Sequence, residues 1–227
     1  MNFTYYGHSC FSVTIGKTVL LFDPFIKSND LAVKAGVDFK KIPADYILLS
    51  HGHYDHVEDA PAIAKRTGAT VIAGYEVSEW LSKKGAKFVH GMNHGGSYTF
   101  PFGRVKFVNA VHSSTLPDGS AGGNAGGYVV ETLAGSFYYS GDTALTLDMQ
   151  LIERFKPGFA VLCIGDNFTM GVEDAIQAAK WAGTKNVIGV HYDTFPPIKL
   201  DKESATKAFK KAGLKLHLPA INSTIKL

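Results

Sequence analysis

Short apolar runs alternate along the chain with longer segments whose apolar positions repeat at helical spacing, and this pattern predicts the secondary structure. Runs rich in valine, isoleucine, phenylalanine and tyrosine are typical of β-strands. We expect strands at Cys10–Ile15, Thr18–Phe22, Tyr46–Leu49, Thr70–Ala73, Val105–Val111, Gly127–Glu131, Phe137–Tyr139, Ala160–Ile164 and Asn186–Val190. Glycine-containing turns at Ile15-Gly16-Lys17 and Pro101-Phe102-Gly103 predict antiparallel hairpins.

Helix signals stand between some of these strands. The predicted helices are Glu58–Arg66, Val77–Lys84, Glu173–Ala182 and Lys202–Ala212. A glycine follows closely after each of them, which is typical of a helix end, and Asp201 is placed to cap the last one. Strands that alternate with helices, together with hairpins, indicate sheets covered by helices. No interdomain linker interrupts the pattern, so we expect a single domain over residues 1–227.

Composition and charge narrow the class of partner. The apolar content of 45% and the charged content of 19% are ordinary for a globular protein. Lysine and arginine exceed the acidic residues by only 23 to 20, a net charge of +3. Lys83, Lys84 and Lys87 form at most a local basic patch, and no long basic block exists. We therefore expect a small-molecule substrate and no nucleic-acid partner.

The first residues of the chain and the length of its apolar runs predict where in the cell the protein is located. The first residues, MNFTYY, have neither the basic nor the apolar region of a signal peptide, and no apolar run approaches the roughly 20 residues of a membrane helix. These features predict a cytoplasmic protein with no membrane partner. Cys10 and Cys163 lie in separate apolar stretches, so we expect two buried free thiols rather than a disulfide.

Side chains that bind metals follow four of the predicted strands. The strand Tyr46–Leu49 leads into Ser-His-Gly-His-Tyr-Asp-His, and three other strands lead into a histidine or an aspartate; these residues are His51, His53, Asp55, His56, His112, Asp142 and His191. The backbone at a strand end is held rigidly by the sheet, and ligands that follow several strands can converge on one point. Imidazole and carboxylate donors without a thiolate suit zinc, manganese or iron. The pattern therefore indicates a metal site.

Each of these residues also has a simpler interpretation. A single histidine such as His112 or His191 is often only a hydrogen-bonded side chain, and Asp142, after Ser-Gly, is often a turn residue or a helix cap. Four residues of metal-ligand type within six positions are difficult to explain as an ordinary polar loop. Because extended backbone repeats its side-chain direction every two residues, His51 and His53 can hold one ion together.

The order of these residues resembles a known family. His51-Gly52-His53-Tyr54-Asp55-His56 resembles the signature of the metallo-β-lactamase superfamily, and the later histidines and aspartate follow in its order. The resemblance implies an α+β fold, a four-layer αββα sandwich with metal ions at one edge between two β-sheets. Further motifs are similar to the UPF0173 group of metal-dependent hydrolases, near ascorbate-6-phosphate lactonase and, more distantly, N-acyl-phosphatidylethanolamine phospholipase D. These motifs are Gly7–Phe11, Met92–Gly96, His112–Ser114, Ser140–Thr143, Ile164–Gly171 and His191–Pro196.

The resemblance also implies a set of ligands. One ion would be held by His51, His53 and His112. The other would be held by Asp55, His56 and His191, and Asp142 would bridge the two. We expect two divalent ions, zinc first, with manganese, iron or nickel as alternatives. Neither cysteine stands where the best-known β-lactamases carry a cysteine ligand, which is the position of Asp142 here.

Further candidates surround this set. Asp55 is the residue expected to orient an activated hydroxide and to pass on the proton released from the water. His8 is the second candidate catalytic residue, the alternative being a packed core histidine. Asp23 is expected to support a ligand histidine, the alternative being an ordinary turn aspartate before Pro24. Asp166 and Asn167 are expected to contact substrate or to support the site; the alternative is that they cap the helix that begins near Gly171.

Two metal ions side by side lower the pKa of bound water toward about 7, which makes hydroxide available at neutral pH. We therefore predict a hydrolase that acts on a small ester, lactone or phosphodiester. The alternatives are a phosphodiesterase or nuclease acting on nucleic acid and a non-catalytic metal-binding domain. The modest charge disfavours the first, and the complete ligand set disfavours the second. A homo-oligomer is suggested only by the similarity to the lactonase-like proteins.

Overall fold

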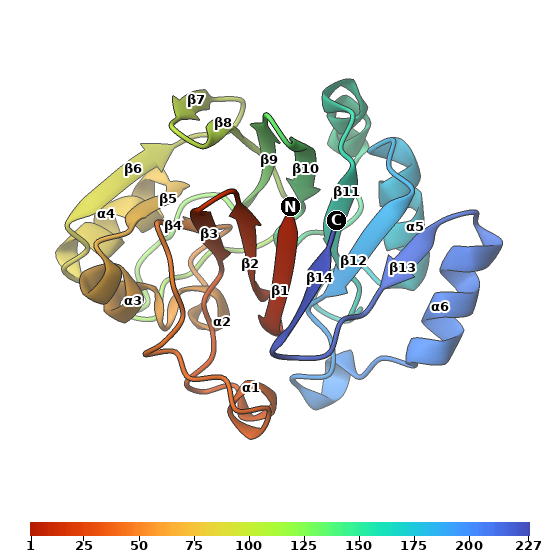
Figure 1. Cartoon of the computed structure of the whole chain (residues 1–227), viewed down its shortest axis with the longest axis horizontal. Coiled ribbons are helices and arrows are strands. Elements are labelled where there is room, and N and C mark those ends of the chain that lie inside the picture. Colours follow the sequence, from red (N-terminus) through yellow and green to blue (C-terminus); the bar gives the residue numbers. More distant parts are fainter. The chain divides into compact units, whose positions relative to one another are not determined.

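The computed structural model describes residues 1–227, whose contacts group them into two compact units. Unit 1 comprises Met1–His94, Ser113–Ala125 and Pro219–Leu227, and unit 2 comprises Gly95–His112 and Gly126–Leu218. Each unit contains one seven-stranded sheet with its own helices, labelled in Figure 1. The expectation of a single domain stays a prediction.

The sheet of unit 1 has the strand order β14-β1-β2-β3-β4-β5-β6. Its strands are β1 (Asn2–Gly7), β2 (Cys10–Ile15), β3 (Thr18–Phe22), β4 (Tyr46–Leu49), β5 (Thr70–Gly74), β6 (Phe88–Met92) and β14 (Ser223–Lys226). The four strands from β14 to β3 pair antiparallel, whereas β3, β4, β5 and β6 pair parallel. The carboxyl ends of β3 and β4 therefore lie side by side, and the chain leaves both of them at the same edge.

Helices cover one face of this sheet. They are α1 (Asp30–Lys34), α2 (Tyr54–Val57), α3 (Ala60–Thr67) and α4 (Tyr75–Lys83). Ile47 and Leu49 of β4 belong to the same buried cluster as Ile63 of α3 and Leu81 of α4. Because strand side chains alternate between faces, Leu48 points to the opposite face, where it is also buried. Figure 1 shows α4 beside β6, and the two elements are in contact.

The helix predicted at Glu58–Arg66 begins two residues later, at Ala60. Tyr54–Val57 instead forms the separate short helix α2. Between the two helices, the buried carboxylate of Asp59 accepts hydrogen bonds from the backbone N–H groups of Ile26 and Lys27 at 2.7 and 3.0 Å. The chain turns at Asp59 because this side chain ties it to the segment that follows β3.

The sheet of unit 2 has the order β13-β12-β11-β10-β9-β8-β7. Its strands are β7 (Ser97–Phe100), β8 (Gly103–Asn109), β9 (Gly126–Thr132), β10 (Gly135–Tyr139), β11 (Phe159–Cys163), β12 (Asn186–Val190) and β13 (Lys215–His217). The pairs from β7 to β10 are antiparallel and those from β10 to β13 are parallel. As in unit 1, the parallel part brings the carboxyl ends of neighbouring strands to one edge.

The helical elements of unit 2 are η1 (Leu147–Phe155), α5 (Val172–Trp181), η2 (Pro196–Ile198) and α6 (Lys202–Lys211), of which η1 and η2 are 3₁₀ turns. Ala178 and Ala179 of α5 belong to one buried cluster with Leu162 of β11 and Phe209 of α6. Asp201 caps α6, as predicted, by accepting hydrogen bonds from two backbone N–H groups.

The predicted central strands are all present, with ends shifted by at most two residues. β1 had no prediction, although it lies between β14 and β2 and is largely buried. The four edge strands β6, β7, β13 and β14 had none either. Their side chains are only partly buried, so the apolar pattern that marks a strand is weak there. Both cysteines are buried and free, as expected. No helix has the length and hydropathy that a bilayer-spanning segment needs.

Residues Ser113–Ala125, the middle segment of unit 1, form a small hairpin that we call the 113–125 hairpin. It contains most of the glycine-rich stretch Asp118–Gly127. Thr115 and Ala121 pair across it as an antiparallel bridge. Its tip is attached to α4, because the indole N–H of Trp80 donates to Asp118 Oδ2 at 2.6 Å. Leu116 is buried in the core cluster of unit 1. The hairpin is therefore an ordered part of the fold.

We expect the attachment of this tip to depend on pH. Hydrogen bonds from Ser120, and then from Trp80, lower the pKa of Asp118 from 3.8 to about 2. A carboxyl whose pKa is lower in the folded protein contributes stability above about pH 4 that is lost as the pH falls toward about 2. In a Trp181→Phe background, the emission of Trp80 should change over that range. The Asp118→Asn variant should lack this change, and an identical change in both proteins would contradict the assignment.

Candidate metal centre

The candidate ligands of unit 1 come from the ends of two neighbouring parallel strands. Asp23 directly follows β3, and the segment from Ser50 to His56 follows β4. The backbone N–H of Asp23 donates to the carbonyl of Leu48 at 3.1 Å, which holds the two strand ends together. Asp23 has a φ of 40°, in the left-handed region that non-glycine residues seldom adopt. The backbone thus turns sharply to direct this carboxylate toward the loop after β4.

The carboxylate of Asp23 is fully buried and supports two histidines. Oδ2 lies 2.8 Å from His56 Nδ1. Oδ1 accepts the backbone N–H of Ser50 at 2.8 Å, and Oδ2 accepts the Ser50 hydroxyl at 2.5 Å. The same hydroxyl oxygen lies 2.9 Å from His51 Nδ1. Because the Ser50 hydroxyl donates to Asp23, its oxygen is free to accept a hydrogen bond from His51 Nδ1–H. One carboxylate thus orients His56 directly and His51 through Ser50.

The third histidine of this loop has a different partner. His53 Nε2 lies 3.1 Å from the hydroxyl of Ser113, and His53 Nδ1 lies 3.0 Å from His51 Nε2. Two nitrogen ligands of a tetrahedral zinc ion are about 3.3 Å apart, given zinc–nitrogen bonds of about 2.05 Å. The two inner nitrogens therefore have nearly the separation that one ion requires. The donor set fits a metal ion.

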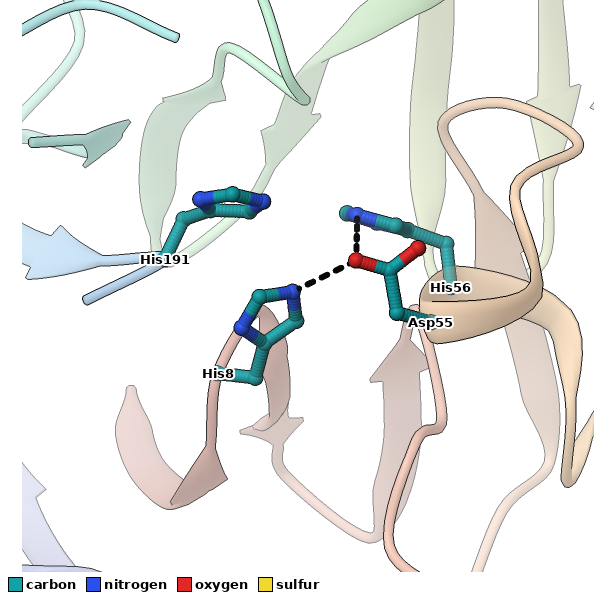
Figure 2. A group of neighbouring side chains, drawn as sticks. All are labelled: His8, Asp55, His56 and His191. Carbon is teal, nitrogen blue, oxygen red and sulfur yellow. Dashed lines mark hydrogen bonds and ion pairs between the residues drawn. The ribbon is translucent and has the colours of Figure 1, made fainter. Parts of the chain in front are cut away.

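His8 and Asp55 form a pair in unit 1. His8 Nε2 lies 3.0 Å from Asp55 Oδ2, and that oxygen lies 3.9 Å from His56 Nε2. Figure 2 shows His8 and Asp55 pointing toward each other, with Asp55 on the first turn of α2. His8 is buried, packs edge-on against the ring of Phe25 and has a φ of 55°. Left-handed backbone at a non-glycine residue is frequent at functional sites.

The candidate ligands of unit 2 also cluster. Asp142 Oδ2 lies 2.8 Å from His191 Nε2 and 3.8 Å from His112 Nε2. The chain beside Asp142 and the chain beside His112 are joined by a hydrogen bond of 3.1 Å from Ala144 N to the Val111 carbonyl. One buried carboxylate oxygen therefore faces two imidazole nitrogens. Asp142 is therefore placed beside two candidate ligands of unit 2.

Asp166 and Asn167 do not cap α5, which excludes the simpler interpretation of these two residues. The helix is preceded by Gly171 and has no side-chain hydrogen bond at its start. Asp166 and Asn167 are exposed, with φ values of 62° and 55°. Asp166 lines a cavity of about 410 Å³ in unit 2 together with Glu173 and Lys199. The contact of Asp166 and Asn167 with substrate stays a prediction.

The two thiols take no part in the donor set. Burial raises the pKa of Cys10 well above its ordinary value, and burial with the nearby Asp142 carboxylate raises that of Cys163 to about 11. Both thiols therefore stay protonated at neutral pH, whereas metal ligation requires a thiolate. Nitrogen and oxygen donors remain, as the sequence indicated.

Two supporting residues were missed in the sequence. Ser50 and Ser113 each stand next to a candidate ligand along the chain, Ser50 before His51 and Ser113 after His112. That adjacency was the available signal. Ser113, however, supports His53, which lies 60 positions away, and only the fold brings the two together.

Comparison with known proteins gives consistent matches. A family model described as "Beta-lactamase superfamily domain" matches residues 18–192. A UPF0173 metal-dependent hydrolase of Christiangramia forsetii is 50% identical over 228 residues, covering 100% of both chains. Another, of Methylacidiphilum infernorum, is 48% identical over 226 residues and covers 99% of both. The solved structure of Igni18, a metallo hydrolase of the archaeon Ignicoccus hospitalis, has a TM-score of 0.87 and 31% identity, covering 99% of this chain and 97% of that one.

Replacing Asp23 by asparagine should weaken metal binding without a change in any ligand. We expect zinc affinity to fall by about 10- to 100-fold, because His56 and Ser50 lose their charged acceptor. The free energy of unfolding of the metal-free protein should fall by about 1–3 kcal/mol. Chelator competition and urea unfolding measure the two effects. Asp38→Asn, at an exposed position, is the matched control; zinc affinity of Asp23→Asn equal to that of the control would refute the supporting role.

Proposed function

The chain belongs to the beta-lactamase superfamily, in its UPF0173 group of metal-dependent hydrolases, and from this premise we propose that it uses two divalent metal ions to hydrolyse a small ester, lactone or phosphodiester. The family predicted from the sequence motifs is confirmed. So are the α+β class and the metallo-β-lactamase fold, with two mixed sheets and flanking helices. The protein is a metal-dependent hydrolase, as its relatives are named.

The proposed ligands form two sets. We propose that one ion takes His51, His53 and His112 and that the other takes Asp55, His56 and His191, with Asp142 shared. Within unit 1, the short separation of the His51 and His53 nitrogens supports the first set. Within unit 2, the position of Asp142 Oδ2 near two imidazoles supports the bridge.

The observation that carries this proposal is the hydrogen bonding of three histidines in one loop. Each has one ring nitrogen beside a protein oxygen: His51 beside Ser50, His53 beside Ser113 and His56 beside Asp23. A neutral imidazole carries one proton, so a proton held at that nitrogen leaves a lone pair on the other. Ligand histidines in metalloproteins are oriented in this way. An ordinary polar loop has no need for three such pairs.

When bound, two divalent ions supply a hydroxide at neutral pH and polarise the oxygen of the bond under attack. Asp55 then acts as proton acceptor for the attacking water. His8 holds the Asp55 carboxylate in place and is within reach of its proton, since the two side chains lie 3.0 Å apart. Because His8 is buried and packed against Phe25, it keeps Asp55 in one orientation.

The finer assignments extend this proposal. Zinc is the first choice of ion, and manganese, iron or nickel are alternatives, because histidine and carboxylate donors suit all of them. A small-molecule substrate, a cytoplasmic location and a homo-oligomer are part of the proposal as well. Nucleic acid is disfavoured as substrate. In the basic patch on and after α4, Lys84 lies near Asp118 and over the Trp80 ring, so its charge is partly balanced.

A substrate panel tests the proposed reaction. Zinc-loaded protein should hydrolyse simple lactones or bis-p-nitrophenyl phosphate faster than short RNA, and dialysis against a chelator should abolish this activity until zinc is restored. Asp55→Ala should lower kcat by about 10²–10⁴-fold, the usual contribution of a positioned proton acceptor. Asp38→Asn, an exposed carboxylate away from the loop, should retain wild-type rates.

Each contrary outcome has a defined meaning. Equal rates for Asp55→Ala and wild type on every substrate would favour a non-catalytic metal-binding domain. A clear preference for RNA would favour the nuclease alternative over the small-molecule hydrolase.

A further inference from the structure

The 113–125 hairpin contacts the ligand loop through two consecutive serines. Ser113 Oγ lies 3.1 Å from His53 Nε2. Ser114 Oγ accepts the backbone N–H of Gly52 at 2.9 Å and donates to the carbonyl of Gly122 at 3.1 Å. Gly52 stands between His51 and His53 in the sequence. The base of the hairpin therefore touches the segment that carries two proposed ligands of one ion.

The hairpin that carries these serines is held at both ends. At its base, the N–H of Gly122 donates to the Ser114 carbonyl at 2.7 Å. Near its tip, the N–H of Leu116 donates to the Ser120 carbonyl at 2.9 Å, and Trp80 holds Asp118. Leu116 adds a buried apolar contact. Ser113 is thus placed by an element with its own hydrogen bonds, not by a freely moving loop.

Backbone contacts fix the distance between the hairpin and the ligand loop. A Cβ on Gly52 would lie 3.1 Å from Leu116 and 3.2 Å from the Ser114 carbonyl. A Cβ on Gly122 would lie 2.3 Å from the same carbonyl, which no real side chain allows. Gly52 lets the ligand loop approach the hairpin this closely, and Gly122 does the same for the two arms of the hairpin. These contacts place the backbone of Ser113 close to His53.

We propose that Ser113 is a positioning residue for the metal centre: its hydroxyl oxygen accepts a hydrogen bond from His53 Nε2–H and so keeps the Nδ1 lone pair directed at the ion. This inference rests on the proposed function. A neutral imidazole can carry its proton on either nitrogen, and the partner of one nitrogen decides which. Without the Ser113 hydroxyl, the protein would no longer select the tautomer or the ring orientation that binds.

Exposure sets the size of the expected effect. The partners of the other two histidines, Ser50 and Asp23, are buried, whereas Ser113 is exposed and His53 is half-buried. Water can therefore replace part of the lost contact at His53. We expect the loss on removal of this hydroxyl to lie near the lower end of the usual range, about tenfold in metal affinity.

The test compares Ser113→Ala with Ser113→Thr, which keeps the hydroxyl, and with Ser223→Ala as matched control. Ser223 is half-buried, and its hydroxyl donates to the Ala220 carbonyl instead of contacting a site histidine. Chelator competition measures the zinc affinity. The visible absorption of cobalt-loaded protein reports the ligand field, and thermal unfolding of metal-free protein reports the stability of the fold. Ser113→Ala should bind one of the two ions about tenfold more weakly and show a changed cobalt spectrum, with the unfolding midpoint unchanged. The other two variants should match wild type.

Two results would overturn the positioning role. One is wild-type zinc affinity and cobalt spectrum in Ser113→Ala. The other is a lower unfolding midpoint of metal-free Ser113→Ala that accounts for the weaker binding, which would show a structural role only. His53→Ala separates this inference from the proposed function: if that variant binds both ions as wild type does, the ligand assignment itself fails. If it loses one ion while Ser113→Ala loses nothing, only the inference fails.

Discussion

The buried carboxylate of Asp23 is the constraint on which the candidate centre depends. It contacts His56 directly and His51 through Ser50, within a shell of hydrogen bonds between 2.5 and 2.9 Å. Its place follows from topology, because β3 and β4 are parallel neighbours and end at one edge of the sheet. A charge buried at 0% exposure needs partners that satisfy it, and the loop after β4 supplies them. The folding of unit 1 and the orientation of two proposed ligands are therefore linked.

The same principle extends to the rest of the loop, with different partners. His53 depends on a serine from a hairpin that joins unit 1 from a distant part of the sequence, and Asp55 depends on the buried His8 after β1. Three separate segments thus orient the side chains of one short loop. In unit 2, the buried Asp142 stands between two histidines from two other strand ends. Rigid strand ends with oriented side chains are what a metal-dependent hydrolase requires, since its ligands must be preorganised.

The sequence predicted the centre of the fold better than its margins. Strands such as β4 and β12 were placed with correct ends, because fully buried strands appear as continuous apolar runs. The edge strands were missed because about half of their side chains face solvent, and the largely buried β1 was missed as well. The helix after the ligand loop begins later than predicted because Asp59 binds the chain after β3. The candidate ligands could be predicted from their spacing in the sequence. The contact of Ser113 with His53 could not be predicted, because serine is common and only the tertiary structure decides which residue its hydroxyl contacts.

We propose that the seven candidate ligands hold a pair of ions. The most direct test is the metal content of zinc-loaded protein by elemental analysis, after loosely bound metal has been removed on a desalting column. The account predicts two zinc ions per chain in the wild type, and clearly fewer in a variant with both His51 and His56 replaced by alanine. A wild-type content of one ion or none, or a double variant that retains two, would contradict it.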